Sequence, residues 1–409
     1  MASGKRHVPW RPAGCVALAA LLAACTDSPP APAAATVRDS AGIRIVEHPA
    51  GALAELPEWR VSAEPAVSIG GSPDAADDLN EVVGGYLAPD GAIVYADGAA
   101  HEIRLHGSDG THIRSLGRRG SGPGEFSNIT SIWQRGDSTA VYDMSAKRLS
   151  VLAHDGSPPR IAVLRHTGFL TWVQGSADGR LITRRLDLDA LSGVGAATVR
   201  VPEHVMVLSA DGSATDTILT IPGSAFYLPS ESPGWEGPAS LGLGPESALL
   251  VLGDSIVIGT NQSYELAIHD LAGRAVRIIR LAAPARSVEE LDIERARQAA
   301  WEEFAPRAAN MPPEIVTRFR SFLADQRYAE HFPFYGTLAA DHAGNLWVQE
   351  YPDGAAGERF TIIGRDGMLV ARVTLPDGLH FLAAGDGRVL GVWRDADGVQ
   401  QLRVHTLTR

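Results

Sequence analysis

The chain has 409 residues, enough for one large β domain, and 45% of them are hydrophobic, enough for a sizeable core. The formal net charge at pH 7 is −12, and lysine and arginine form no clustered stripe. Because nucleic-acid binding rests on basic patches, the composition argues against DNA or RNA as a partner.

The N-terminus joins a basic segment to a short apolar one. Lys5, Arg6 and Arg11 precede the run GCVALAALLAA (14–24), which is too short to span a bilayer of about 30 Å as a helix. The run ends in LAAC (22–25), which resembles the lipobox of bacterial lipoproteins, where the cysteine is lipidated and becomes the new N-terminus. We expect residues 1–24 to be a lipoprotein signal peptide and Cys25 to carry the lipid; an ordinary signal peptide is the alternative.

A proline- and alanine-rich segment follows this cysteine. We expect residues 25–37 to be the lipidated cysteine and a flexible tether, and 38–409 to be the folded domain. By resemblance to enterobacterial lipoproteins, Thr26 after the cysteine favours outer-membrane sorting. The expected location is therefore the bacterial cell envelope, with the membrane as a partner through the anchor and the domain facing the periplasm or the cell surface.

Beyond the tether, the chain repeats a pattern in which a Gly/Asp turn enters a short β-branched run. It occurs in DGAIVYAD (90–97), GDSTAVYD (136–143), DGRLITRR (178–185), GDSIVIGT (253–260), AGNLWVQE (343–350) and DGRVLGVW (386–393). A second turn follows in GSDGTHIRSL (107–116), AHDGSPPRIAVL (153–164), SADGSATDTILTI (209–221), HDLAGRAVRIIRL (269–281) and GRDGMLVARVTL (364–375).

The two turns define a four-stranded antiparallel sheet of about 40–45 residues, the size of one propeller blade. The chain contains six of the first turns but only five of the second. The last unit, which begins near His380, therefore lacks its second turn and its fourth strand. Residues 64–80 can supply that strand, which would close the ring and hide two sheet edges. The fold class is therefore all-β: a six-bladed β-propeller of four-stranded blades, closed by an N-terminal strand.

The stretch GRRGSGPGEF (117–126) has the glycines and arginines of a phosphate loop. However, no helix follows it and no Gly-Lys-Ser/Thr is present, so phosphate binding is not the prediction. We interpret it as a structural turn between two blades, in which glycines reverse the backbone, proline stiffens it and the phenylalanine anchors it. Its residues are Gly117, Gly120, Gly122, Pro123, Gly124 and Phe126.

This stretch, with DHAGNLWVQEY (341–351) and RDSAGIRIVEH (38–48), resembles the NHL-like six-bladed β-propellers found among bacterial lipoproteins. The resemblance covers roughly residues 38–409 and implies the propeller fold. The resemblance implies no particular activity, because propellers host many unrelated functions.

One segment, 287–332, interrupts the β pattern. Residues 287–304 begin with a capping box and 312–328 begin with prolines, and both then place apolar residues at helical spacing. We predict a two-helix insertion between blades four and five. It could cover an edge or an end of the propeller, dock a partner protein, or close over the channel as a lid with Arg318, Arg320 and Arg327 facing an anionic ligand.

No nucleophile motif stands out, and the mature chain would contain no cysteine beyond Cys25. Some propellers hold a metal in the central channel with scattered Asp, Asn and Glu, and Asp341, Asn345 and Glu350 are the candidates here. Local turn formation by Asp341 and Asn345 is the competing interpretation. The sequence predicts no cofactor and leaves Ca²⁺ or another divalent metal open.

The leading functional hypothesis is a binding or scaffolding module for an envelope protein or a small ligand. The alternative is a hydrolase acting on esters or lactones, or a lyase, with a metal-dependent site in the channel. A purely structural envelope component is the third reading. An inward cluster of carboxylates would favour the enzyme, and a ligand pocket would separate a binding module from a structural one.

Overall fold

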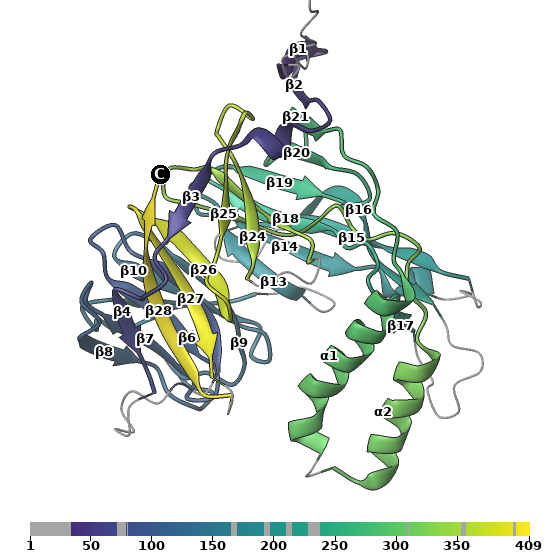
Figure 1. Cartoon of the computed structure of the whole chain (residues 1–409). Coiled ribbons are helices and arrows are strands. Elements are labelled where there is room, and N and C mark those ends of the chain that lie inside the picture. The colour runs from purple at the N-terminus through teal and green to yellow at the C-terminus, as the bar shows by residue number, and fades with distance from the viewer. Residues whose placement is uncertain are drawn as a thin grey trace, which may run out of the picture. The chain divides into compact units, whose positions relative to one another are not determined.

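The computed structural model describes residues 34–71, 79, 81–164, 170–191, 197–209, 215–227, 238–308, 311–352, 357–395 and 398–409. These residues belong to one compact unit, which runs from residue 33 to residue 409 (Figure 1). The predicted signal peptide and Cys25 lie outside the described residues. No helix in the described ranges is long and apolar enough to cross a membrane.

The simplest repeating element is a four-stranded antiparallel sheet in which each strand pairs with the next. Two such sheets follow one another, and their strands are β5 (Val82–Leu87), β6 (Ile93–Asp97), β7 (Glu102–His106) and β8 (His112–Leu116), then β9 (Ile129–Gln134), β10 (Ser138–Asp143), β11 (Arg148–Ala153) and β12 (Arg160–Val163). The second strand of each sheet is fully buried. The predicted Gly/Asp turns precede these buried strands, and Gly91 and Gly136 supply the positive φ angles of 90° and 58° that the turns require.

The next two sheets add strands to this unit. The first of them contains β13 (Leu170–Gly175), β14 (Leu181–Leu186), β15 (Val199–Leu208), β16 (Thr215–Tyr227) and β17 (Ala239–Ser240). The second contains β18 (Ala248–Leu252), β19 (Ser255–Gly259), β20 (Glu265–Asp270) and β21 (Ala275–Leu281), extended by β2 (Ile43–His48) and β1 (Thr36–Ser40). β2 runs parallel to β21, an addition that the sequence pattern does not reveal, and β1 begins inside the predicted tether.

The last strands of the chain pair with strands from its beginning. These are β22 (Tyr335–Ala340), β23 (Leu346–Glu350), β24 (Arg359–Ile363) and β25 (Leu369–Thr374), then β26 (Leu379–Gly385), β27 (Arg388–Arg394) and β28 (Gln400–Thr408). β4 (Val67–Ile69) pairs antiparallel with β28, as predicted for residues 64–80. β3 (Glu58–Val61) was not predicted; it lies between β25 and β28 and joins the two sheets.

The predicted structural turn lies between β8 and β9. Phe126 is fully buried among Val94 and Ile103 of one sheet and Val141 of the next, which fixes the loop between the sheets. The carboxylate of Glu125 accepts hydrogen bonds from the Gly122 N–H at 2.8 Å and from Arg118, and these bonds hold the pKa of Glu125 below its ordinary value. The loop is thus closed on itself, as expected of a turn.

The first strands of the sheets pack beside one another: β5 lies between β26 and β9, β9 lies beside β13, and β22 lies between β18 and β26. Apolar clusters fill the spaces between sheets, and one of them stacks Trp347 of β23 on Phe381 of β26 at 5.1 Å between ring centroids. Antiparallel sheets packed face to face, with their first strands gathered together, are the arrangement of a β-propeller.

Two helices form where the sequence predicts them, between β21 and β22: α1 (Glu290–Ala308) and α2 (Pro313–Asp325). They lie side by side and extend away from the β17 end of the sheets (Figure 1). No described residue of α1 is buried, whereas the ring of Phe304 stacks on Phe319 at 4.0 Å. The helices therefore pack mainly on each other. After α2, Tyr328 forms a β-bridge with Gly242, which follows β17, and this bridge connects the helical insertion to the sheet.

Candidate functional site

A cavity of about 630 Å³ lies where the first strands meet, and we call it the channel cavity. The first strand of every sheet contributes to its wall: β5, β9, β13, β18, β22 and β26. This volume is within the range of about 300–1,000 Å³ that is usual for small-molecule sites. None of its described lining residues belongs to the helical insertion 287–332.

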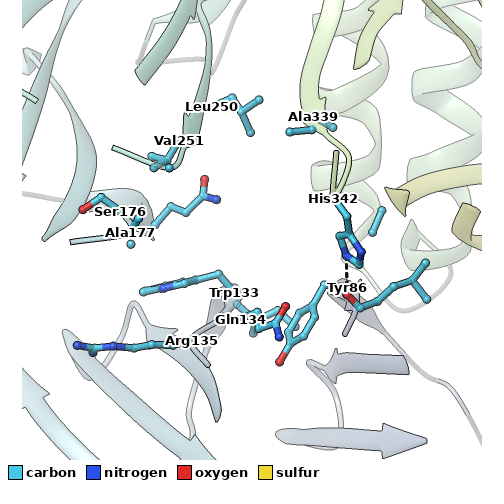
Figure 2. Close-up of a pocket in the computed structure, with 18 of the residues that line it drawn as sticks. Tyr86, Trp133, Gln134, Arg135, Ser176, Ala177, Leu250, Val251, Ala339 and His342 are labelled. Carbon is cyan, nitrogen blue, oxygen red and sulfur yellow. Dashed lines mark hydrogen bonds between the residues drawn. The ribbon is translucent and has the colours of Figure 1, made fainter. Parts of the chain in front are cut away.

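The wall has two chemically different sides. Tyr86, Trp133 and Gln134 form the aromatic and polar side, and Leu250 with Ala339 lies across from them (Figure 2). The polar side comes from β5 and β9, and the apolar side comes from β18 and β22. A ligand that fills the cavity would therefore meet ring faces and amides on one side and aliphatic groups on the other.

Trp133 owes its position to a glycine on the neighbouring strand. A Cβ atom at Gly175 would lie 2.5 Å from the Trp133 Nε1 atom, so the indole ring occupies space that any other residue would fill. Within the described part of the chain, the indole N–H and the Gln174 amide have no hydrogen-bond partner. These two groups line the cavity and remain available to hydrogen-bond a ligand.

The phenol of Tyr86 is held from behind the cavity wall. Its Oη lies 2.9 Å from Thr139 Oγ1 and 3.4 Å from His154 Nε2, and His154 Nε2 lies 3.0 Å from the same threonine oxygen. Burial raises the pKa of Tyr86 to about 12 and lowers the pKa of His154. Both side chains are therefore uncharged at neutral pH, and the network fixes the Tyr86 ring without placing a charge in the wall.

His342 lies at the rim of the cavity, in the turn between β22 and β23. Its Nε2 atom lies 2.9 Å from the Leu87 carbonyl oxygen, the contact drawn as a dashed line in Figure 2, and Nδ1 lies 3.0 Å from Asp386 Oδ2. Both ring nitrogens thus face oxygen acceptors. This arrangement ties the ends of β5, β22 and β26 together and engages both ring nitrogens in contacts within the protein.

The described lining of the channel cavity contains no Asp or Glu side chain. Divalent metals such as Ca²⁺ require several carboxylate or carbonyl oxygens, so the side chains of this cavity do not fit a metal ion. Indole, phenol and amide groups fit an uncharged ligand that offers a flat face and hydrogen-bonding oxygens.

The predicted anion-binding arginines lie on and after α2, away from this cavity. Arg318 and Arg320 are exposed, and the Arg320 guanidinium lies 4.2 Å from the centre of the Trp301 ring on α1. Arg327 lies 5.1 Å from the centre of the Tyr227 ring. Because 287–332 contributes nothing to the described cavity wall, the structure does not bring the three arginines to the channel cavity as a lid would.

The predicted metal ligands do not converge. Asn345 donates its backbone N–H and its side-chain Nδ2–H to the carboxylate of Asp341, each at 2.9 Å, which is the local turn chemistry considered as the alternative. Glu350 lies at the other end of β23 and accepts hydrogen bonds from Arg372 at 2.8 and 2.6 Å. Among the residues that the structure describes, no group of three or more His, Cys, Asp or Glu could hold a metal ion.

The cavity residues Trp133, Gln134 and Gln174 were not identified from the sequence. A signal was present, because each first strand ends just before a predicted Gly/Asp turn. Aligning the six segments that precede those turns would have placed their side chains around a common centre. The polar side chains of these strands could then have been identified from the sequence as candidate cavity residues.

No protein-family model matches the chain, and no curated protein matches it either. Solved structures do resemble it. A member of the DUF4221 family from Bacteroides vulgatus is 10% identical with a TM-score of 0.50, and the alignment covers 87% of this chain and 100% of that one. At this identity the likeness indicates a shared fold and nothing about activity.

Two further structures are similar at lower scores. One is a Bacteroides fragilis protein described as exported, with 11% identity, a TM-score of 0.48, and coverage of 89% of this chain and 100% of that chain. The other is a gluconolactonase from Xanthomonas campestris, with 12% identity, a TM-score of 0.42, and coverage of 85% and 98%.

Proposed function

We propose that this chain is a lipid-anchored, six-bladed β-propeller of the bacterial cell envelope that binds a small uncharged ligand in the channel cavity. The proposal of an uncharged ligand rests on one observation, the composition of the wall of the channel cavity. Ring faces and unpaired amide and indole groups line it together with the exposed Arg135, and its described wall contains no carboxylate. A ligand-sized pocket favours a binding module over a purely structural component.

The six-bladed reading rests on the strand pairing. Each of the six repeated Gly/Asp turns precedes the second strand of a sheet, and β4 provides the fourth strand that the last sheet lacks. On this reading the helical insertion follows the fourth blade and precedes the fifth. Such closure leaves no free edge at the junction between the two ends of the chain.

The alternative function, a metal-dependent hydrolase or lyase, has less support. Asp341, Asn345 and Glu350 are engaged in separate local interactions, and His342 faces an acceptor at each nitrogen. The described cavity lining supplies no carboxylate, and its tyrosine and histidine, Tyr86 and His342, are held by other protein groups.

Thermal unfolding of the full chain in detergent tests the binding function. Uncharged sugars and aromatic alcohols should include a compound that raises the unfolding temperature, since a ligand at 100 times its Kd adds about 2.7 kcal/mol to the free energy of unfolding. Trp133→Ala should abolish the shift. Trp301→Ala, which removes an indole from α1, is the matched control and should retain it. A shift that survives Trp133→Ala, or one given by organic acids alone, would contradict the proposal.

The anchor has a test of its own. The chain should fractionate with membranes when expressed in a bacterium, and Cys25→Ser should release it to the soluble fraction or leave it unprocessed. Retention of both processing and membrane association in the variant would rule out lipidation at Cys25.

A further inference from the structure

A second cavity, of about 570 Å³, lies between the long β15–β16 hairpin and strands β18 and β22. We call it the Glu203 cavity after the buried carboxylate that helps to line it. The described lining of the channel cavity has Arg135 but no carboxylate, whereas the lining of this cavity includes two carboxylates, Glu203 and Glu246, beside Arg184. Nothing in the proposed function uses this cavity.

The hairpin brings Glu203 into place by departing from regular pairing. β15 and β16 are longer than the strands of the simple four-stranded sheets, and their register shifts between Arg200 and Pro202. Gly223 on the partner strand lies close to Glu203: a Cβ atom there would lie 2.7 Å from the Glu203 Cγ atom and closer still to the Val201 carbonyl oxygen. The absence of a side chain at Gly223 is therefore what leaves room for the glutamate.

The arginines of this region donate mainly to backbone carbonyl oxygens, although the buried Arg184 Nε atom has no hydrogen-bond partner in the described part of the chain. Arg200 donates to the carbonyl oxygens of Gly223 at 2.6 Å, Pro222 at 3.0 Å and Thr260 at 3.1 Å. Arg184 donates from Nη1 to the Ser247 carbonyl oxygen at 2.9 Å. These guanidinium groups are held by the backbone, which leaves them fewer donors for an anionic ligand.

The two acids are less completely paired. Glu203 is 9% exposed and forms an ion pair with Arg184, whose Nη1 atom lies 3.4 Å from Oε2, but this buried Oε2 atom accepts no hydrogen bond in the described part of the chain. Glu246 is exposed, and among the described residues its carboxylate has no hydrogen-bond or ion-pair partner. A buried acceptor atom without a donor is costly, so a donor on a ligand could bond to Glu203 Oε2 and to the Glu246 carboxylate.

The electrostatics of the cavity agree with this geometry. Burial raises the pKa of Glu203 and Glu246 adds to this rise, whereas Arg184, Arg200 and a hydrogen bond from the Ser224 backbone lower it. Burial likewise raises the pKa of Tyr351, with Glu246 adding to the effect. The negative charge of Glu203 is thus only partly compensated, and an incoming cation would complete the compensation.

We propose that the Glu203 cavity binds an organic cation: a primary ammonium group on a small apolar body. The ammonium contacts the carboxylates of Glu203 and Glu246, and the Glu203 carboxylate can turn toward it because the last torsion of glutamate is broad. The apolar body packs against Leu186, Phe226 and Leu243, which line the same cavity.

Calorimetric titration of the full chain with 2-phenylethylamine tests this proposal, with 2-phenylethanol as the uncharged analogue of the same shape. The amine should bind at least about tenfold tighter than the alcohol. Glu203→Gln should weaken amine binding about 30-fold, since it removes one partner of a buried charge pair, and leave the alcohol unaffected. Glu246→Gln, at the opening, should weaken amine binding by a smaller factor.

Glu314→Gln, on exposed α2, is the matched control and should bind the amine like the parent chain. The proposal is overturned if amine and alcohol bind equally, if neither binds, or if both cavity variants retain the parent affinity for the amine. Trp133→Ala should leave amine binding unchanged, so failure of this proposal and failure of the channel-cavity proposal can be told apart. Circular dichroism of each variant checks that it is folded.

Discussion

The channel cavity and the Glu203 cavity share one wall, at Leu338 of β22, yet their chemistry is opposite. The channel cavity is built from the short first strands of regular sheets, and its described lining is free of carboxylates. The Glu203 cavity is built against an irregular, lengthened hairpin, and buried charge collects there. Regular repetition produces a pocket whose described lining has no carboxylate, and departure from the repeat introduces the carboxylates.

Loosening the packing between regular sheets should have the largest effect. Phe126→Ala removes a fully buried ring between two sheets and should lower the free energy of unfolding by about 3–5 kcal/mol. Denaturant unfolding measures the change. Phe319→Ala, which removes a partly buried ring from the helical insertion, should cost less. Equal losses in the two variants would mean that the helices contribute to the core as much as the sheets do.

A substitution in the lengthened β15–β16 hairpin, Glu203→Gln, should have a smaller effect on stability, and it should stabilise the fold instead of destabilising it. Because burial raises the folded-state pKa of Glu203, protonation favours the folded state, and the stability contributed by this group is lost as pH rises above about 4.5. Glu203→Gln should therefore raise the unfolding temperature at neutral pH and should raise it less at pH 4.5.

The measurement is thermal unfolding of both chains across this pH range, with Glu314→Gln as the control. A difference between variant and parent chain that stays constant with pH would contradict the assigned environment of Glu203.

Gly175→Ala should act on the channel cavity without disturbing the Glu203 cavity. The added methyl group meets the Trp133 indole and displaces it, so affinity for the uncharged ligand should fall at least about tenfold. Gly175 has an ordinary backbone angle, and Trp133 is only partly buried, so the unfolding temperature should change little. Unchanged affinity would show that the indole does not contact the ligand.

The smallest effect is expected from metal ions. Ca²⁺ added to the chelator-treated full chain should leave the unfolding temperature unchanged, because the described channel lining has no carboxylates and Asp341 and Glu350 are engaged locally. A clear upward shift would instead restore the metal-dependent alternative.

Much of the sheet structure could be predicted from the sequence, because local turn residues mark where the strands begin. Gly91, Gly136 and Gly253 mark the entry to buried second strands, and the pairing of 67–69 with the last strand follows from a missing turn. The additions of β2 and β3 could not be predicted, because they pair with strands far away in the chain and carry no turn signal of their own.

The sites were harder to predict for a physical reason. Asp341 and Glu350 were chosen by residue type, but a metal site depends on convergence. Asp341 lies in the turn before β23, and Glu350 lies at the far end of that strand. Glu203 gave no signal, because its role depends on the register shift in β15–β16 and on the missing side chain at Gly223. Residue type suggests chemistry, while register and neighbours decide where that chemistry is placed.

The most direct test of the central claim is a crossed titration of the two cavities. The full chain, Trp133→Ala and Glu203→Gln are each titrated with 2-phenylethylamine and with the uncharged compound that stabilises the parent chain. We predict that Trp133→Ala loses the uncharged ligand alone and that Glu203→Gln loses the amine alone. If one substitution abolishes both ligands, or if each ligand survives both substitutions, the two cavities are not separate sites of opposite chemistry.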